Sequence, residues 1–217
     1  MTTPPGLPLP APRSSPHRTP ELSCPVRRAV FLDRDDTLVE CRSLPARAFA
    51  SGRPGDLADP AFVRLLPGVR EACTTLRDAG FALVIVSNQG VVARGGASPS
   101  QVEATHARVR ELLHDDHGRT LIDASYGCPF HPEGRVSEYT REHPWRKPAP
   151  GMLLAAARDL HLDLAHSWLI GDADRDALSG VNAGLAPERA LVVGPGRAHA
   201  DMPSAAAHIL AHGARRA

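Results

Sequence analysis

The hydrophobic positions of this chain fall into short continuous runs separated by stretches with helical periodicity. Residues 29–32, 81–86 and 168–170 are dominated by β-branched, aromatic and other large apolar side chains, so they predict buried strands. Weaker strands are predicted at 122–126 and 191–193. Helices are predicted at 67–78, 100–116, 151–160, 174–183 and 204–212. This alternation predicts an α/β fold, a doubly wound parallel sheet covered by helices on both faces.

Local signals mark several helix ends. Gly80 follows the end of the first predicted helix and is a typical stop signal. Ser98 or Ser100 can cap the helix predicted at 100–116, and Glu103 lies three residues after Ser100, as in a capping box. These signals support the helix assignments.

Two segments stand outside the alternation. Residues 1–25 are rich in Pro, Ser and Thr and have few large apolar side chains, so they predict a disordered tail before a domain at 26–217. An ordered arm packed on the domain is the alternative. Residues 128–145 show little periodicity and predict a short irregular insert near the active site.

Composition narrows the classes of partner. A chain of 217 residues suits one domain with a sizeable core. Its formal net charge of +1 argues against nucleic acid as a partner, although a local basic patch stays open. No apolar run is long enough for a membrane span and the N-terminus lacks a signal-peptide core, so we expect a cytoplasmic protein that does not bind membranes. The four cysteines are scattered along the chain, so no disulfide framework is predicted. Separately, we expect the protein to be a monomer.

Two carboxylates follow the first predicted strand. Asp33 and Asp35 are two residues apart, directly after the apolar run. In an open parallel sheet the carboxyl ends of the strands line the ligand crevice. Two carboxylates there can hold a hard divalent cation, and one can act as a nucleophile and the other as an acid and base. The alternative is a solvated acidic turn after an edge strand.

Three further signals occur at comparable places. The second strong strand ends in Ser87 and Asn88, and the third ends in an acidic cluster at 172–176. Lys147 directly precedes a predicted helix, within the run Arg-Lys-Pro-Ala-Pro-Gly-Met. A capping Ser-Asn turn and a surface lysine are the alternative interpretations of the first and the last.

Together these signals resemble the four motifs of the haloacid dehalogenase superfamily of phosphohydrolases, over about residues 27–193. The resemblance implies a Rossmann-like core and a magnesium-dependent phosphatase. Asp33 would attack phosphorus and become an aspartyl-phosphate. Asp35 would protonate the leaving alkoxide and later activate water. A dehalogenase would need only the first Asp, so Asp35 favours phosphoryl chemistry.

The resemblance also assigns the groups that bind the phosphoryl oxygens. Ser87 would donate its hydroxyl to the transferring phosphoryl group, with Asn88 beside it, and Lys147 would reach the same oxygens. Arg146 is a candidate for a second, non-reacting phosphate or carboxylate, because a guanidinium forks onto such groups.

The same resemblance implies a magnesium site. Its ligands would be Asp33, Asp172 and the backbone carbonyl of Asp35. Asp176, four residues after Asp172, would orient Lys147 or a metal-bound water. Asp174 is expected to cap the helix that it opens.

Within the superfamily, the Ser-Asn-Gln and Arg-Lys-Pro-x-Pro-Gly-Met runs resemble the branch that includes heptose bisphosphate and histidinol phosphatases. Many members of this branch carry a structural zinc in the insert. Here Cys128, His131 and His143 remain as ligands, but Trp145 stands where another would be. Structural zinc sites are almost always four-coordinate, and nothing in the sequence places a fourth ligand such as His114 or His117. We therefore expect no zinc and an insert packed by aromatic side chains.

One position departs from most relatives, which have Gly where this chain has Asp36. Asp tolerates turn conformations better than most residues, so this change is not expected to inactivate the protein.

The resemblance leaves several functions open. The leading hypothesis is a magnesium-dependent phosphatase for a small phosphorylated metabolite, namely removal of the 7-phosphate of D-glycero-D-manno-heptose 1,7-bisphosphate. Histidinol phosphate or another sugar phosphate is the alternative substrate. A DNA 3′-phosphatase fits the near-neutral charge poorly. A non-catalytic binding module fits poorly with intact catalytic positions.

Overall fold

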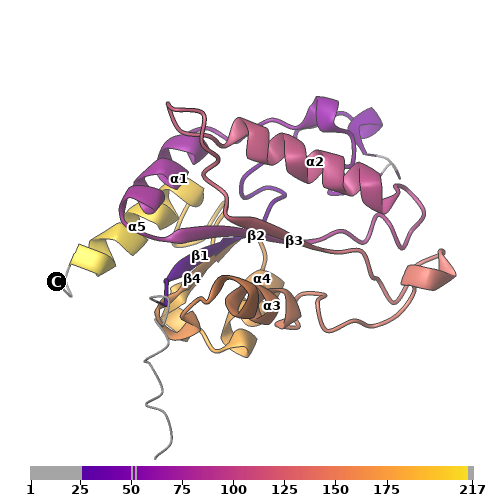
Figure 1. The fold of residues 1–217 in the computed structure, drawn as a ribbon. Helices are drawn as coiled ribbons and strands as arrows, with labels where there is room; N and C mark the ends of the chain where they lie inside the picture. The colour runs from indigo at the N-terminus through magenta and orange to yellow at the C-terminus, as the bar shows by residue number, and fades with distance from the viewer. Residues whose placement is uncertain (1–25, 50, 52, 215–217) are drawn as a thin grey trace, which may run out of the picture.

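A computed structural model describes residues 26–49, 51 and 53–214, which form a five-stranded parallel sheet between two layers of helices (Figure 1). The tail predicted at 1–25 lies outside the described residues. The strands lie in the order β3-β2-β1-β4-β5, and each neighbouring pair is parallel. Their bounds are β1 Ala29–Leu32, β2 Ala82–Asn88, β3 Ala124–Cys128, β4 Trp168–Gly171 and β5 Ala190–Val192. The predicted α/β class and the doubly wound sheet are confirmed.

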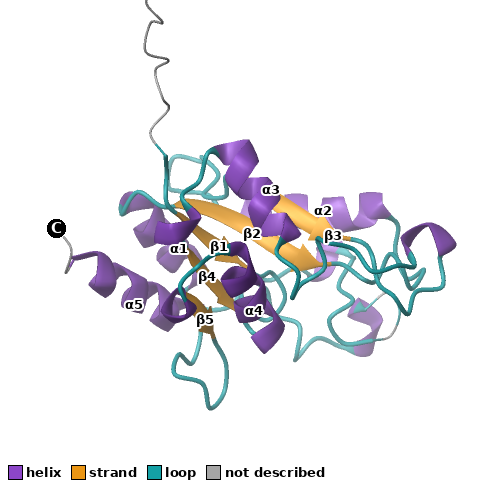
Figure 2. Cartoon of the chain, turned by 90° about the horizontal axis from the view of Figure 1, so that it is seen from below, coloured by secondary structure: helices purple, strands orange, loops and turns teal. Residues whose placement is uncertain are grey.

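Helices cover both faces of the sheet. In Figure 1, α1, α2 and α5 lie above the sheet, and α3 and α4 lie below it; Figure 2 shows the same elements from below. The helices are α1 Val69–Asp78, α2 Pro99–Leu112, α3 Gly151–Leu160, α4 Asp174–Ala183 and α5 Met202–Ala214. In the part of the chain that the structure describes, no helix has the length and apolar character that a membrane span needs.

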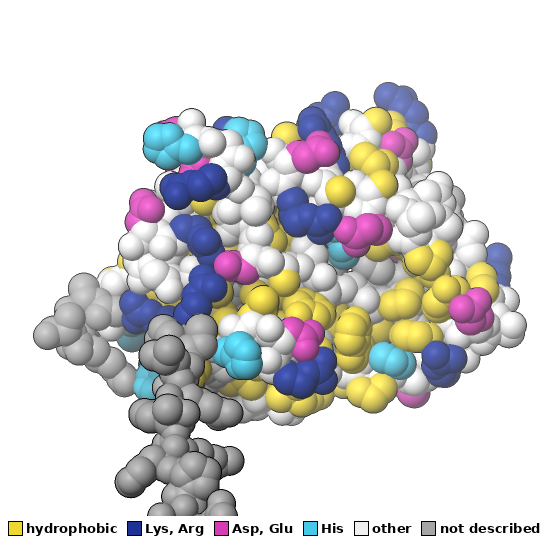
Figure 3. All heavy atoms as spheres, in the orientation of Figure 1, with side chains coloured by type: hydrophobic (Ala, Val, Ile, Leu, Met, Phe, Trp, Pro, Cys, Tyr) yellow, Lys and Arg dark blue, Asp and Glu magenta, His cyan; other side chains and the backbone are white. Residues whose placement is uncertain are grey.

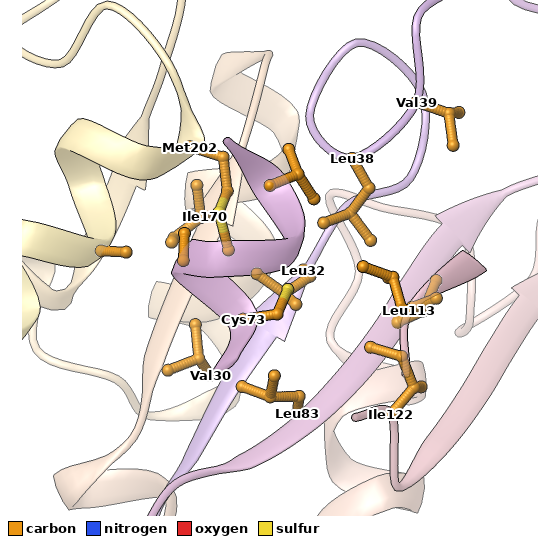
Figure 4. Close-up of a cluster of buried hydrophobic side chains, with 14 of the residues drawn as sticks. Val30, Leu32, Leu38, Val39, Cys73, Leu83, Leu113, Ile122, Ile170 and Met202 are labelled. Carbon is orange, nitrogen blue, oxygen red and sulfur yellow. The ribbon is translucent and has the colours of Figure 1, made fainter. Parts of the chain in front are cut away.

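Alternate residues of each central strand enter different cores. Val30 and Leu32 of β1 pack with α1 and α5 in the larger core, part of which is shown in Figure 4. Ala29 and Phe31 point to the opposite face and pack with α3. Successive side chains of a strand leave opposite faces of the sheet, so a strand buried on both faces is a continuous apolar run. This double burial is why 29–32 was recognisable in the sequence.

The chain order places three strand ends at one crevice. From β1 the chain moves outward through β2 to β3 and then returns to β4 on the other side of β1. Ligands bind at such a switch point, outside the carboxyl ends of the strands. The backbone N–H of Asp33 donates to the carbonyl of Ile170 at 2.9 Å. This hydrogen bond fixes the backbone of Asp33 beside the end of β4.

Some element bounds differ from the prediction. Strand β2 continues through Ser87 and Asn88, whose backbones pair with β3. The predicted extension of α2 to residue 116 was wrong: the helix ends at Leu112, and Asp115 instead closes the next turn by accepting from two backbone N–H groups. Ser98 is the N-cap, and its capping-box partner is Gln101.

The surface is mixed in charge. On the face shown in Figure 3, Lys and Arg side chains are interspersed with Asp and Glu. This agrees with the formal net charge of +1.

A buried histidine links α2 to the sheet. His106 is 2% exposed and packs over Gly127 of β3, where a Cβ would approach its Cε1 to 3.1 Å. Burial, together with the charges of Arg34 and Arg110, lowers the pKa of His106 to about 3. The folded state therefore keeps this imidazole neutral, whereas the unfolded chain binds a proton below its ordinary pKa of 6.5.

Stability is therefore expected to fall as the pH drops from 6.5 toward 3. At pH 5 this one group lowers the free energy of unfolding by about 2 kcal/mol relative to neutral pH. His106→Leu should flatten the dependence, measured by urea unfolding between pH 7.5 and 4.5. The exposed His117→Leu is the matched control. An unchanged slope in His106→Leu would contradict this assignment.

Candidate active site

The carboxyl ends of β1, β2 and β4 open into a cavity of about 370 Å³. Acidic groups occupy part of its wall and cationic groups occupy another part. The acidic and polar lining includes Asp33, Asp35, Asp172, Ser87 and Asn88, and the cationic lining comprises Arg42, Arg53, Arg94, Arg146 and Arg175. The predicted site residues that follow different strands are thus brought together.

A buried lysine bridges two carboxylates beside this cavity. Lys147 Nζ lies 2.5 Å from Asp33 Oδ1 and 2.7 Å from Asp176 Oδ1, and it donates to the Val86 carbonyl at 2.8 Å. All three charged side chains are at most 6% exposed. Asp33 follows β1, Lys147 precedes α3, and Asp176 lies in the first turn of α4. The predicted contact between Asp176 and Lys147 is therefore present.

Burial and the neighbouring charges set the ionisation of this cluster. Burial raises the pKa of Asp33 to about 7, with Lys147 opposing the shift and the Asp176 and Asp35 carboxylates adding to it. Burial by itself would lower the pKa of Lys147, but Asp33 and Asp176 outweigh it and raise that pKa. Lys147 is therefore a fixed positive charge next to the first carboxylate.

Asp35 has a different partner. Arg34 is fully buried and forks onto it, with Nε 2.9 Å from Oδ1 and Nη2 3.0 Å from Oδ2. The Cys41 thiol donates to Oδ1 at 3.4 Å. The two carboxylates thus have different partners, as their two expected roles require: a buried lysine holds Asp33, and a buried guanidinium holds Asp35.

Three carboxylates converge closely enough to hold a metal ion. Asp33, Asp172 and Asp176 each offer an oxygen within 4.8 Å of the others. Asp172 Oδ1 is buried and has no hydrogen-bond partner, while its Oδ2 accepts from Arg42 at 3.0 Å. An orphaned carboxylate oxygen in an all-oxygen cluster suits a hard cation such as Mg²⁺. The contribution of the Asp35 backbone carbonyl stays a prediction.

Ser87 and Asn88 end β2 at the cavity. Ser87 Oγ accepts a hydrogen bond from Gln89 Nε2 at 2.8 Å. The Asn88 amide brackets the backbone of Lys147, accepting from its N–H at 2.9 Å and donating to its carbonyl at 3.0 Å. Asn88 thereby positions the buried lysine, a role that the sequence did not reveal. Its predicted contact with substrate stays a prediction.

Arg146 faces the cavity from the insert side. Its Nη1 donates to the Phe130 carbonyl at 3.3 Å. The other lining cations were not predicted from the sequence; they are Arg42, Arg53, Arg94 and Arg175. Arg94 lies in the loop after β2 and forms an ion pair with buried Asp56. The two residues are distant in the sequence, so the position of Arg94 at the cavity depends on the tertiary structure.

Asp36 occupies the turn where the family resemblance predicts glycine. Its φ is 55°, in the left-handed region that favours Gly but that Asp also adopts. Its Oδ1 accepts from the backbone N–H groups of Cys41 and Arg42 at 3.0 and 2.9 Å. These two hydrogen bonds explain how the carboxylate is accommodated.

The expected cap at Asp174 was wrong. Ala173 is the N-cap of α4, and Asp174 is already helical and pairs with Arg197 at 3.1 Å. The capping interaction comes from Asp176, whose Oδ2 accepts from the Ala173 N–H at 3.0 Å. Asp176 thus closes the helix end and holds Lys147 with its other oxygen.

The predicted zinc remnant does not form a ligand set. His131 Nδ1 accepts from the Glu133 N–H at 3.0 Å, and His143 Nδ1 accepts from the Trp145 N–H at 3.1 Å. The His143 ring stacks on Phe130, with centroids 4.1 Å apart. Among the described residues, the aspartates at 33, 172 and 176 are the one group whose ligand atoms converge for a metal. The donor set of Cys128, His131 and His143 does not fit zinc.

Chelation of zinc is therefore expected to leave thermal unfolding of the protein unchanged. Phe130→Ala, in contrast, should lower the free energy of unfolding by about 1–2 kcal/mol, because it removes the stacking partner of His143. Differential scanning calorimetry of the wild type with and without a zinc-selective chelator measures the first effect. The same measurement on Phe130→Ala gives the second. Stoichiometric zinc in the purified protein, with unfolding on chelation, would contradict the prediction.

The chain is similar to known hydrolases in sequence. Residues 144–212 match a family model described as HAD-hydrolase-like. A D-glycero-D-manno-heptose-1,7-bisphosphate 7-phosphatase of Thermosynechococcus vestitus is 42% identical over 161 residues, 73% of this chain and 76% of the relative. A D-glycero-beta-D-manno-heptose-1,7-bisphosphate 7-phosphatase of Mesorhizobium japonicum is 37% identical over 158 residues, 73% of this chain and 66% of the relative.

A solved structure shares the fold. The D,D-heptose 1,7-bisphosphate phosphatase from B. bronchiseptica, complexed with magnesium and phosphate, superposes with a TM-score of 0.66 and 26% identity. The match covers 85% of this chain and 99% of that one.

Proposed function

Because this chain belongs to the haloacid dehalogenase superfamily and is one of its phosphatases, we propose that it removes the 7-phosphate of D-glycero-D-manno-heptose 1,7-bisphosphate with the help of Mg²⁺. The observation that carries the proposal is the buried cluster of Asp33, Lys147 and Asp176, which lies beside the cavity that Asp33 and Asp35 line. The names of the relatives support the choice of substrate.

In the proposed reaction Asp33 is the nucleophile. One of its carboxylate oxygens attacks phosphorus, the bond from phosphorus to the sugar oxygen breaks, and an aspartyl-phosphate forms. Lys147 neutralises charge on the phosphoryl oxygens throughout, and Ser87 donates a hydrogen bond to one of them. Asp33 and Asp172 would hold Mg²⁺, which supplies further charge neutralisation when bound.

Asp35 is the proposed acid and base. It protonates the leaving sugar oxygen in the first step. In the second it takes a proton from water, whose oxygen attacks phosphorus and releases Asp33 and inorganic phosphate.

The cationic wall is the proposed site of the second phosphate. Arg146, Arg53 and Arg175 line the cavity. A cavity of about 370 Å³ is of the size that takes a small metabolite. A substrate with two phosphates can place one at Asp33 and the other against these guanidinium groups.

Phosphate release from a substrate panel tests this function. The panel holds the heptose bisphosphate, the heptose 7-phosphate, histidinol phosphate, other sugar phosphates and a DNA 3′-phosphate, each with Mg²⁺ or with chelator. We expect Mg²⁺-dependent release with the highest kcat/KM for the bisphosphate. A higher kcat/KM for histidinol phosphate would replace the substrate and keep the chemistry. No release from any compound by folded protein would overturn the proposal.

Arg146→Gln tests whether Arg146 binds the second, non-reacting phosphate of the substrate. Its KM for the bisphosphate should rise about 10- to 100-fold, because a charge-assisted contact is lost, while KM for the heptose 7-phosphate stays near the wild-type value. Steady-state kinetics on both substrates measure the difference. Equal changes for both would place Arg146 elsewhere in the reaction.

A further inference from the structure

We propose that Gln89 is a positioning residue that turns the hydroxyl proton of Ser87 toward the phosphoryl site. The inference rests on the proposed phosphatase chemistry and adds a residue that neither the motifs nor the comparisons assign. Gln89 follows the end of β2 and is 3% exposed.

The side-chain amide of Gln89 lies between three polar groups. Its Nε2 donates to Ser87 Oγ at 2.8 Å and lies 3.5 Å from Asp35 Oδ2. Its Oε1 accepts from Arg34 Nη2 at 3.1 Å. Arg34 also forks onto Asp35, so one buried guanidinium contacts both the amide and the carboxylate.

The charges of Arg34 and Asp35 fix which way the amide faces. A guanidinium has only donors, and an ionised carboxylate has only acceptors. The reverse orientation would place the NH₂ of Gln89 against Arg34 and its carbonyl against Asp35, and each contact would be repulsive. The observed orientation is therefore the one that the hydrogen-bonding chemistry permits.

This orientation determines what Ser87 can do. A serine hydroxyl has one proton to donate, and here its oxygen already accepts from Gln89. Within the described residues the hydroxyl has no protein acceptor, and Ser87 lines the cavity with Asp33. The proton is thus left for an oxygen of the bound phosphoryl group. A preorganised donor of this kind is effective because it needs no reorientation during the reaction.

Substitution of Gln89 by Glu tests the direction of the proton. The new carboxylate is nearly isosteric and can still pair with Arg34, but it accepts from Ser87 and turns the proton inward. We expect kcat to fall about 100-fold, the usual effect of losing one preorganised donor. Affinity for inorganic phosphate in the presence of Mg²⁺, measured by calorimetry, should fall as well. Gln101→Glu, in the cap of α2, makes the same change away from the cavity and should leave kcat unchanged.

A double-mutant cycle tests whether Gln89 acts through Ser87. Gln89→Met should lower kcat about 10-fold in the wild-type background and should have no further effect in Ser87→Ala. Thermal unfolding checks that each variant is folded, and Gln89→Glu carries the test if Gln89→Met does not fold. Additive losses in the cycle would overturn the role of Gln89 alone. An unchanged kcat in Ser87→Ala would instead remove Ser87 from the proposed function.

Discussion

Asp33→Asn is expected to lower kcat by about 10⁴-fold or more while the protein stays folded. The amide cannot attack phosphorus as a carboxylate does, so the covalent route is closed. The fold should persist because Lys147 keeps its partner Asp176 at 2.7 Å and its bond to the Val86 carbonyl. Steady-state phosphate release and circular dichroism measure the two halves of the expectation.

The control is Asp78→Asn, which makes the same chemical change at an exposed position at the end of α1. Asp35→Asn adds a covalent measurement: it should slow both steps, because Asp35 is the acid of the first and the base of the second. The aspartyl-phosphate that forms should then persist on Asp33, where peptide mass spectrometry detects it. Phosphate release by Asp33→Asn near the wild-type rate would exclude the covalent mechanism.

Lys147→Met is expected to damage both activity and stability. The methionine cannot neutralise phosphoryl charge, so kcat should fall about 10³-fold. It also leaves Asp33 and Asp176 buried without their cation, which should lower the free energy of unfolding by about 3–5 kcal/mol. Kinetics and urea unfolding of the same preparation measure both effects.

A second substitution separates the two effects. Lys147→Met combined with Asp176→Asn removes one positive and one negative charge together, so most of the lost stability should return. The activity should not return, because no cation reaches the phosphoryl oxygens. Recovery of kcat together with stability would mean that Lys147 acts only through the fold.

The central part of the fold was predictable because burial leaves a strong sequence signal. Strand β1 is buried on both faces, and its apolar run ends directly at Asp33. Ser87 and the acidic cluster at 172–176 likewise follow strongly apolar strands, so a shared edge of the sheet could be inferred. Strand β3 was placed two residues too early, because Ala124–Cys128 is only partly buried and contains Ser and Gly.

The parts that were missed depend on contacts between distant segments. The Asn88 side chain makes two hydrogen bonds with the Lys147 backbone, and Gln89 contacts Arg34. These residues are far apart in the sequence, so their contacts leave no periodic pattern in it. The cations of the cavity wall come from separate loops, so spacing along the chain carries no trace of them. The sequence left Ser98 and Ser100 open as the cap of α2, and the backbone geometry selects Ser98 with Gln101 as its partner.

The strand order also limits when the proposed catalytic centre can form during synthesis. Central β1 pairs with β4, where Leu32 lies beside Ile170, and the chain completes β2 and β3 in between. A nascent chain that has emerged only through β3 holds Asp33, Asp35 and Ser87 but lacks Lys147 and Asp172. Chains emerge N-terminus first, and contacts between distant segments form late in folding. The proposed catalytic centre is therefore completed only after β4 has paired with β1. A ribosome-bound fragment ending before β4 would therefore have an exposed edge on β1 and no complete catalytic centre.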